Sequence, residues 1–332
     1  MTVSIYGAGM AGTYLAKLLE KYGIKYAIYD NRKYPDCRCA WGIMYRQAKE
    51  LMYNIDYDID DYVLNKPNEI VFNDIHIKNK NLCIFSKMLW LNDLWRDLYI
   101  RKPEKDIDTT HINVDATGNA RAIIGKPDNY TIARCIQYRI LNSDLENNIY
   151  IYTDRPTGYA WAFPLSETEW HVGAGAIKST DVLTLFEALM DKLNIQDPNI
   201  TCKCSDDTKV AHTQYSELPL YDMCKQVITI GEAGGFVSAA GEGNLLAMES
   251  ASILGDILLK TGLFINIVSM YKEQIRMKFS WLNNQYKLLY AMEDKDIVRM
   301  IQLIPRVSYV TVKRLGIGIE DVSRIIRSVV GV

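Results

Sequence analysis

The sequence lacks a long hydrophobic run. None of its apolar stretches approaches the roughly 20 residues that a membrane-spanning helix needs, and the stretch from Leu245 to Leu259 is interrupted by Glu249 and Asp256. Val3 to Tyr6 already reads as a strand, which leaves no room for a secretion signal before it. We therefore expect a cytoplasmic protein.

The sequence also lacks the paired C-x-x-C spacing of a zinc site, so we expect no metal centre. It has seven cysteines, an odd number, at positions 37, 39, 83, 135, 202, 204 and 224. Disulfides are uncommon inside cells, so we expect mainly buried thiols. The C-x-C pairs Cys37/Cys39 and Cys202/Cys204 leave a redox role open.

Internal repeats, low-complexity tracts and long linkers are missing as well. With 332 residues, 48% hydrophobic and 23% charged, the chain can bury the core of one or two domains. The net charge of −2 gives no reason to expect a nucleic-acid partner. Residues 263–332, however, hold eleven Lys and Arg against six Asp and Glu. This basic region is either a solvated helical face or a surface for anionic lipid headgroups or an acidic protein.

A glycine-rich fingerprint stands at the start of the chain. The strand Val3–Tyr6 runs into Gly7-Ala8-Gly9-Met10-Ala11-Gly12, and a helix is expected from Gly9 to Tyr22. In such a fingerprint the first glycine makes a tight turn, the second lets the backbone approach a pyrophosphate, and the third allows close helix packing. We therefore expect Gly7, Gly9, Ala11 and Gly12 to contact a dinucleotide.

Asp30 ends the next predicted strand, Tyr26–Tyr29, where an acidic residue hydrogen-bonds a ribose hydroxyl. Strand, glycines, helix and acid occur in the order that a dinucleotide site requires. FAD and NAD share this pattern, so it does not choose between them.

A second glycine-rich segment stands late in the chain and favours FAD. Gly231-Glu232-Ala233-Gly234-Gly235-Phe236 is followed by Gly241-Glu242-Gly243-Asn244, which opens a helix expected to reach Lys260. The positive end of that helix dipole would stabilise negative charge on a reduced flavin. Two such segments far apart suggest one long cofactor held at both ends, with Gly241, Gly243 and Asn244 near its ring.

The remaining pattern predicts an α/β fold with interleaved domains. Ser86 is expected to cap a helix that reaches about Tyr99, and Ile112–Asp115 is expected to form a further core strand. The runs Ile70–Ile77 and Leu82–Phe85 are expected to pair with each other. We expect a Rossmann-type FAD-binding domain formed by residues 1–65, 86–130 and 225–262. A mainly antiparallel β-sheet substrate domain is expected from residues 66–85 and 131–224, and a C-terminal helical region from residues 263–332.

The order of several motifs resembles the geranylgeranyl reductase family of flavoproteins, which share the shape of p-hydroxybenzoate hydroxylase. Between the two glycine segments stand Arg38-Cys39-Ala40-Trp41-Gly42, Asp115-Ala116-Thr117-Gly118 and Tyr159-Ala160-Trp161-Ala162-Phe163-Pro164. The resemblance covers about residues 1–262, and its most specific elements are the Tyr-x-Trp-x-Phe-Pro strand and the late Gly-Glu-Gly. It implies an FAD enzyme acting on isoprenoid chains.

The resemblance implies that Tyr159, Trp161 and Phe163 line an isoprenoid pocket beside the flavin. Side chains two apart share one face of a strand, so the three rings would form one wall. A plain sheet core is the alternative for this aromatic face.

The family's Arg-Cys-Gly-Glu-Gly loop near the flavin maps onto residues 38–42. Arg38, Cys39 and Gly42 keep their places, whereas Ala40 replaces a glycine and Trp41 replaces the acid. Cys39 either shapes the flavin pocket or acts in catalysis, and the loss of the acid leaves the proton donor open.

Three further positions are implied to contact the cofactor. Glu232 occupies the place of an aspartate that binds the ribityl chain, Lys87 replaces an arginine near the phosphates, and Thr117 lies in the Asp-x-x-Gly segment. The expected substrate is a hydrophobic molecule of the isoprenoid type.

The leading functional hypothesis is reduction of isoprenoid C=C bonds by hydride transfer from reduced FAD. A flavin-dependent monooxygenase or halogenase is the second hypothesis, because halogenases carry a related Trp-x-Trp-x-Ile-Pro strand, and a non-enzymatic flavin or lipid carrier is the third. The chain holds one complete Gly-x-Gly-x-x-Gly unit, so we expect an external electron donor such as ferredoxin. Lys313 and Arg314 in the basic region are candidates for docking it, and peripheral membrane contact is the alternative use of that region.

Overall fold

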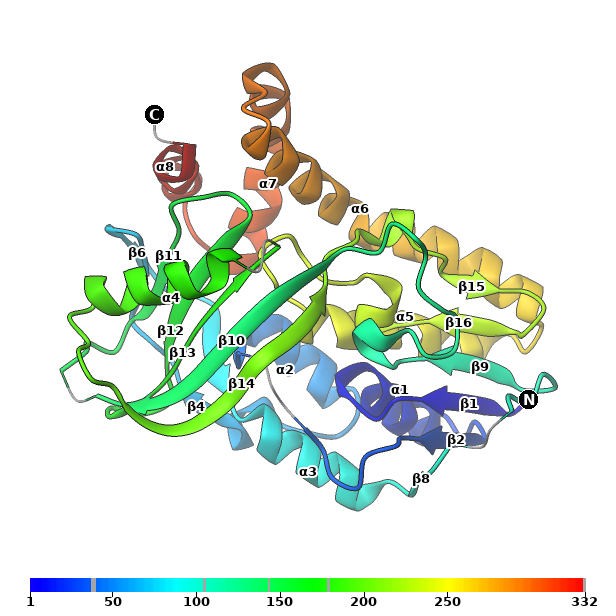
Figure 1. Cartoon of the computed structure of the whole chain (residues 1–332). Coiled ribbons are helices and arrows are strands. Elements are labelled where there is room, and N and C mark those ends of the chain that lie inside the picture. The colour runs from blue at the N-terminus through cyan, green and yellow to red at the C-terminus, as the bar shows by residue number, and fades with distance from the viewer. Residues whose placement is uncertain (37–39, 104–105, 143, 178–179, 331–332) are drawn as a thin grey trace.

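The computed structural model describes residues 1–36, 40–103, 106–142, 144–177 and 180–330. These residues form three β-sheets with helices packed around them. Figure 1 shows a parallel sheet on one side, a large twisted sheet on the other, and the C-terminal helices along the top. The fold is therefore mixed α/β with a helical C-terminal region, as the sequence predicts.

The parallel sheet has the strand order β15-β16-β9-β1-β2-β8. Strands β16, β9, β1, β2 and β8 run parallel, with Ile5 opposite both Ile28 and Val114, whereas the edge strand β15 is antiparallel to β16. These strands are short apolar runs because the sheet is buried beneath helices. The bounds are β1 Val3–Tyr6, β2 Tyr26–Tyr29, β8 Ile100–Arg101, β9 Ile112–Asp115, β15 Tyr221–Asp222 and β16 Val227–Thr229.

Helices from distant parts of the sequence cover this sheet. They are α1 Met10–Lys21, α2 Tyr45–Tyr53, α3 Lys87–Asp97 and α5 Asn244–Lys260. Helices α1 and α5 pack closely, since a Cβ at Gly255 would lie 2.5 Å from Leu18 Cδ2. The predicted cap is confirmed: the Ser86 hydroxyl accepts a hydrogen bond from the Leu89 N–H.

The large sheet has the order β14-β10-β13-β12-β11-β5-β6 and is antiparallel except where β11 meets β5. One face is covered by α4, Thr180–Lys192, against which Ala160 and Ala162 pack. The bounds are β5 Glu69–Phe72, β6 Ile75–Lys78, β10 Ile132–Leu141, β11 Ile149–Tyr152, β12 Gly158–Pro164, β13 Glu169–Ala176 and β14 Asn199–Ala211.

Strand pairing departs from the expected arrangement at two short strands. The hairpin forms within residues 69–78, between β5 and β6, and β7 (Leu82–Phe85) pairs instead with β3 (Gly42–Met44) and β4 (Val63–Asn65). Strand β15 pairs with β16 and so joins the parallel sheet. Periodicity identifies strands but does not identify their partners, which explains both differences.

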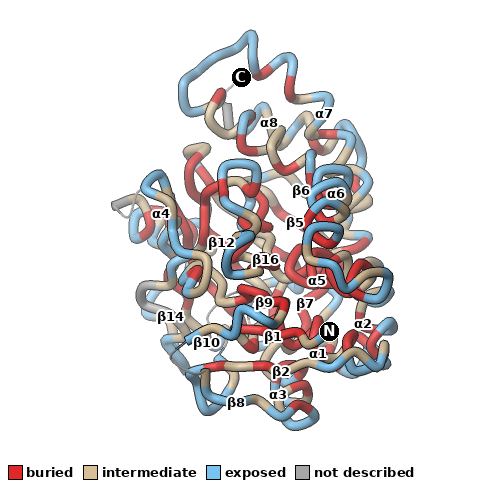
Figure 2. Tube along the Cα trace, turned by 90° about the vertical axis from the view of Figure 1, so that its right-hand side faces the viewer, coloured by how far each residue is buried: buried red, intermediate tan, exposed pale blue. Residues whose placement is uncertain are grey.

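The C-terminal region is helical, with α6 Phe264–Glu293, α7 Ile297–Leu315 and α8 Ile319–Val330. Tyr271 and Phe279 of α6 belong to the main core, whereas Ile317 and Val322 pack around Ile77 of the hairpin. Figure 2 shows buried segments concentrated in β1, β9 and α5, with much exposed surface around α7 and α8. No helix in the described residues is both long and apolar enough to span a bilayer.

Short 3₁₀ turns join several of these elements, at Ile59–Asp61, Gly118–Ala120, Tyr215–Glu217 and Gly231–Gly234. The cysteines differ from the expectation of mainly buried thiols. Five are described and none of these five is in a disulfide, but Cys83 alone among them is buried, while Cys202 and Cys224 are exposed.

Candidate functional site

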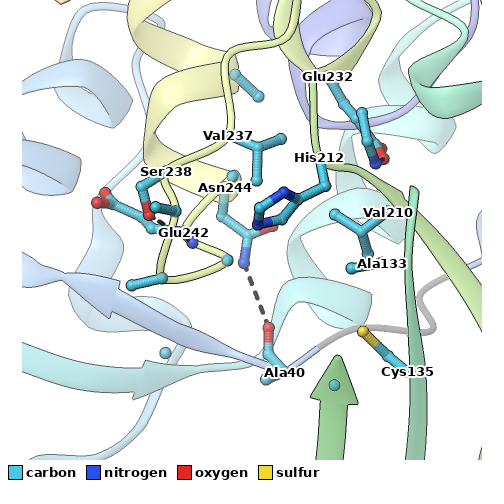
Figure 3. A pocket seen from close by; sticks show the side chains of 18 of the residues that line it. Ala40, Ala133, Cys135, Val210, His212, Glu232, Val237, Ser238, Glu242 and Asn244 are labelled. Atoms are coloured by element: carbon cyan, nitrogen blue, oxygen red, sulfur yellow. Dashed lines mark hydrogen bonds between the residues drawn. The ribbon is translucent and has the colours of Figure 1, made fainter. Parts of the chain in front are cut away.

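One large cavity lies between the two main sheets and the C-terminal helices. Its volume is about 1120 Å³, which is slightly above the roughly 300–1,000 Å³ typical of small-molecule sites. Residues of β1, α1, β12, α5, α6 and α7 all line it. Figure 3 shows part of the lining, where Ala40, His212 and Asn244 project into the same space.

The glycine fingerprint forms one end of the cavity. Gly7 has φ +103°, and a Cβ there would lie 2.4 Å from the Ala116 carbonyl oxygen. A Cβ at Gly12 would lie 1.9 Å from the Gly7 carbonyl oxygen, so both positions exclude a side chain. A Cβ at Gly9 would meet nothing within 4 Å. Gly9 therefore leaves open space where a ligand can approach the backbone.

Both polar groups of the Ala8 backbone are held by side chains. Asp30 Oδ2 accepts the Ala8 N–H at 2.7 Å, and the Trp95 indole N–H donates to the Ala8 carbonyl at 2.8 Å. Asp30 also accepts two side-chain hydrogen bonds from Arg32. Burial opposes ionisation, but the hydrogen bonds from Arg32 and Ala8 hold the pKa of Asp30 below its usual value. Asp30 thus fixes the glycine loop as well as lining the cavity.

Two helix N-termini open into this cavity without side-chain caps. Helix α1 begins after Gly9 and α5 begins after Gly243, and neither N-cap residue makes a side-chain hydrogen bond. Neither helix has an acidic residue in its first turn. First-turn N–H groups and the positive end of the dipole favour anionic or electron-rich ligand groups. The cavity therefore offers two such binding points, one at each helix N-terminus.

The α5 terminus is joined to neighbouring segments through Asn244. The Lys87 ammonium donates to Asn244 Oδ1 at 2.9 Å, and Asn244 Nδ2 donates to the Ala40 carbonyl at 3.3 Å (Figure 3). A Cβ at Gly42 would lie 3.7 Å from the Phe163 ring. The structure thus brings Lys87, Ala40, Gly42 and Asn244 together around one end of the cavity.

Two other predicted residues engage protein groups while lining the cavity. Thr117 donates its hydroxyl to Asp115 Oδ1 at 2.6 Å and accepts the Ala122 N–H at 2.8 Å. Glu232 Oε1 accepts the Ala211 N–H at 2.7 Å. Thr117 therefore has no hydroxyl proton to offer a ligand, and the longer reach of Glu232 connects its loop to the end of β14.

Arg121 was not indicated by the sequence. It is buried with φ +46° and donates to the backbone carbonyls of Gly125, Pro219 and Ala233. Ala233 lies in the turn Gly231–Gly234, so Arg121 holds the late glycine segment against the loop that follows β9. A left-handed, fully buried arginine leaves no recognisable sequence signal.

The three aromatic residues of β12 all line the cavity. The Tyr159 hydroxyl donates to the Ala240 carbonyl at 2.7 Å, and its ring centroid lies 5.4 Å from that of Trp161. Trp161 lies across β13, because a Cβ at Gly173 would be 2.6 Å from its ring. Phe163 packs toward the β3–β7 side of the cavity wall.

Polar atoms without protein partners also face this cavity. Gln137 is 1% exposed; its Oε1 accepts the Trp161 indole N–H at 3.2 Å, while Nε2 has no partner in the described residues. His212 Nδ1 likewise has none, and burial lowers the pKa of His212 to about 4. Both residues are therefore neutral hydrogen-bonding groups available to a ligand.

The C-terminal helices complete the site, which the sequence did not indicate. Arg314 of α7 is 12% exposed and pairs with Glu242 at 2.8 Å and Glu249 at 3.5 Å. Burial raises the pKa of Glu242, with Arg314 opposing the shift. Arg314 is engaged in this ion pair with little of its side chain exposed, whereas Lys313 is exposed. Docking of an electron donor at these two residues stays a prediction.

One arm of the cavity is apolar. It runs between the β5–β6 hairpin and helices α6 and α7, and its lining includes Ile70, Phe72, Ile77, Leu288, Met292, Val307, Val310 and Leu315. The predicted catalytic Cys39 and the neighbouring Arg38 lie outside the described residues, so the structure does not place them.

Comparison with known proteins gives the same fold. No family model matches the chain. An uncharacterized protein of Methanocaldococcus jannaschii is 26% identical over 92% of this chain and 94% of its own length. Digeranylgeranylglycerophospholipid reductase 2 of Methanosphaera stadtmanae is 26% identical over a region that covers 49% of this chain and 44% of that protein.

Among solved structures, a geranylgeranyl bacteriochlorophyll reductase-like protein of Thermoplasma acidophilum has a TM-score of 0.72 at 15% identity. The match covers 98% of this chain and 96% of that protein. The flavin-dependent halogenase CmlS gives 0.65 at 15% identity, over 88% of this chain and 64% of that one. A probable FAD-dependent monooxygenase of Pseudomonas aeruginosa gives 0.65 at 14%, over 92% and 99%. The chain thus has the fold of FAD-dependent flavoproteins.

Proposed function

We propose that the chain is an FAD-dependent oxidoreductase whose cavity holds the cofactor against the two uncapped helix N-termini. Gly7, Gly9 and Ala11 would contact the pyrophosphate, and Gly243 and Asn244 would face the electron-rich part of the ring system. The open space beside Gly9 supports this assignment, since a Cβ there would meet no protein atom within 4 Å. The fold shared with FAD-dependent enzymes supports it independently.

We further propose that the substrate is an isoprenoid lipid or related prenyl compound whose C=C bonds are reduced. The observation that carries this proposal is the apolar arm of the cavity, which continues from the aromatic residues of β12 to α6 and α7. Such an arm suits a long unbranched or methyl-branched chain better than a compact polar substrate. The partial similarity to a digeranylgeranylglycerophospholipid reductase agrees with it.

Bound there in its reduced form, a flavin supplies a hydride, and reduction of a C=C bond takes one proton in addition. The protein's part is to hold the alkene within about 3–3.5 Å of the donor and to exclude water. Tyr159, Trp161 and Phe163 provide an apolar wall for that purpose. The Tyr159 hydroxyl donates to the Ala240 carbonyl, and burial raises the pKa of Tyr159, so Tyr159 is a poor proton donor for this reaction.

The electron donor is proposed to be an external protein. One dinucleotide fingerprint is present in the sequence, and its cavity end is the place assigned to FAD. Mixing the oxidised holoprotein with reduced ferredoxin, and separately with NADPH, would distinguish the two donors by the rate at which the flavin absorbance falls.

The proposed reaction is tested with dithionite-reduced holoprotein under anaerobic conditions. Adding a geranylgeranyl lipid should reoxidise the flavin, and mass spectrometry should show two hydrogens gained for each reduced bond. Flavin that binds tightly but is never reoxidised by any isoprenoid would reject the reductase and favour a flavin carrier.

A monooxygenase is the second candidate, because FAD-dependent monooxygenases and halogenases share this fold. It predicts oxygen uptake with NADPH that rises on addition of an aromatic substrate. Such uptake, without reduction of any prenyl chain, would replace the reductase proposal.

A further inference from the structure

Helix α7 carries an exposed apolar stripe. Val298, Ile301 and Tyr309 are 68%, 66% and 68% exposed, and Pro305 between them is also exposed. These positions are spaced by three or four residues, so their side chains follow one face over about three helical turns. A stripe of large apolar side chains in water is unusual enough to require a partner.

The opposite face of α7 is already occupied. Met300 and Leu303 pack with Leu288 and Ala291 of α6, while Val307 faces the cavity. One helix therefore has a face toward the apolar arm of the cavity and another that is apolar and exposed. Figure 1 shows the α6–α7 turn projecting from the top of the molecule, away from the parallel sheet.

A row of basic residues runs beside the apolar stripe. Arg299, Arg306 and Lys313 are spaced by seven residues, so they lie on one side of α7, and all three are exposed. None of them forms an ion pair with a carboxylate in the described part of the chain. The preceding turn carries exposed acidic residues, Glu293, Asp294 and Asp296. Those charges disfavour insertion of the tip and leave the helix lying flat.

We infer that α7 is a membrane-docking helix that rests on a bilayer surface containing anionic lipids. The apolar stripe would enter the boundary between headgroups and acyl chains, and the basic row would contact lipid phosphates, as in interfacial amphipathic helices. Because the other face of α7 lines the cavity, docking would bring the apolar arm next to the membrane. This inference concerns where the protein works and does not depend on the proposed reaction.

A second copy of the chain is a less suitable occupant. A stable dimer buries about 800 Å² on each partner, drawn from about 20–30 residues, whereas the stripe offers four side chains on one helix. A row of uncompensated positive charges beside it would also repel its own copy. Anionic lipid matches both the apolar and the charged part of this surface.

Vesicle sedimentation tests the inference with the full-length holoprotein. We expect binding to vesicles of equimolar phosphatidylcholine and phosphatidylglycerol, weaker binding to phosphatidylcholine alone, and weakening by salt. Each basic residue near an anionic surface contributes about 1 kcal/mol, so the double variant Arg299→Gln/Arg306→Gln should bind about thirtyfold more weakly.

The variant Ile301→Ser/Tyr309→Ser should also lose binding, while Met277→Ser is the matched control because Met277 of α6 is 73% exposed outside the stripe. Circular dichroism verifies that each variant is folded. Unchanged vesicle binding in both α7 variants would overturn the inference, as would light scattering that shows a dimer broken by the same substitutions. Binding is measured without turnover, so its failure is separate from failure of the proposed reaction.

Discussion

Two glycines in one loop meet different physical constraints. Gly7 is excluded from carrying a side chain by its positive φ and by Ala116, whereas Gly9 has an ordinary backbone conformation and empty space around it. Gly7 therefore serves the fold, and Gly9 is free to serve the ligand.

Gly9→Val is expected to leave the free energy of unfolding of the FAD-free protein within about 1 kcal/mol of wild type. It should weaken FAD binding at least about tenfold, because the new side chain fills the space beside the backbone. Gly7→Ala should instead destabilise the protein itself. Urea denaturation and fluorescence titration with FAD measure the two effects. Gly262→Ala, where a Cβ makes ordinary contacts near Met1, is the control, and unchanged FAD affinity in Gly9→Val would count against the assigned phosphate site.

The second residue-scale prediction concerns Arg121, whose buried guanidinium donates to three backbone carbonyls, of which that of Ala233 is buried. Replacing it with Met removes all three hydrogen bonds and leaves the Ala233 carbonyl unpaired, so we expect the free energy of unfolding to fall by about 3 kcal/mol. Arg96→Met is the matched control: Arg96 is 72% exposed and pairs with Asp93 at the surface, which is worth about 1 kcal/mol or less. Equal losses in the two variants would refute the role given to Arg121.

At the scale of elements, the ion pair of Arg314 with Glu242 and Glu249 joins α7 to α5 and to the loop before it. Arg314→Met removes the cation shared by Glu242, which is 17% exposed, and Glu249, which is 5% exposed, and leaves Lys278 near Glu249. Breaking one side of such a pair costs about 3–5 kcal/mol, and we expect a loss toward the lower end for these partly accessible groups.

The double variant Arg314→Met/Glu242→Gln should recover part of that stability in denaturation experiments, because the unpaired charge is gone. The surface pair Arg324–Asp321 provides the control variant Arg324→Met. A double variant no more stable than Arg314→Met would show that the packing of Arg314 on Trp281, and not its charge, joins these elements.

The elements themselves were largely predictable. Strands β1, β2 and β9, helices α1, α3 and α5 and the mixed α/β class follow from apolar periodicity, glycine spacing and the Ser86 cap, all of which are local. The contacts between distant elements were not predictable. Gln137 meets Trp161 across β13, and Arg314 meets Glu242 far away in sequence, because pairing partners depend on topology that no local pattern records. The sequence indicated the glycines around Glu242 but gave no sign that Glu242 is an ion-pair partner.

For the whole molecule, two buried histidines contribute to the response of stability to acid. Burial lowers the pKa of His171 to about 3 and that of His212 to about 4. Above the ordinary histidine pKa of about 6.5 both are neutral in folded and unfolded chains. As the pH falls below that value the unfolded chain binds protons that the folded chain does not, so stability is lost.

Between about pH 6.5 and 5 each histidine should therefore contribute a slope approaching 1.4 kcal/mol per pH unit. Urea denaturation across this range measures it. His212→Gln should flatten the curve by about one proton. An identical slope in His212→Gln would show that His212 is protonated in the folded protein.

The interleaved order of the chain has a consequence for biosynthesis. Helix α1 is completed early on the ribosome, but its partner α5 and the sheet neighbour of β9, strand β16, are translated only after the whole large sheet. Contacts between such distant segments form late and make folding slow. The N-termini of α1 and α5 can therefore both line the cavity only once most of the chain has emerged, and a nascent chain ending before Asn244 should be unable to retain a cofactor that contacts both.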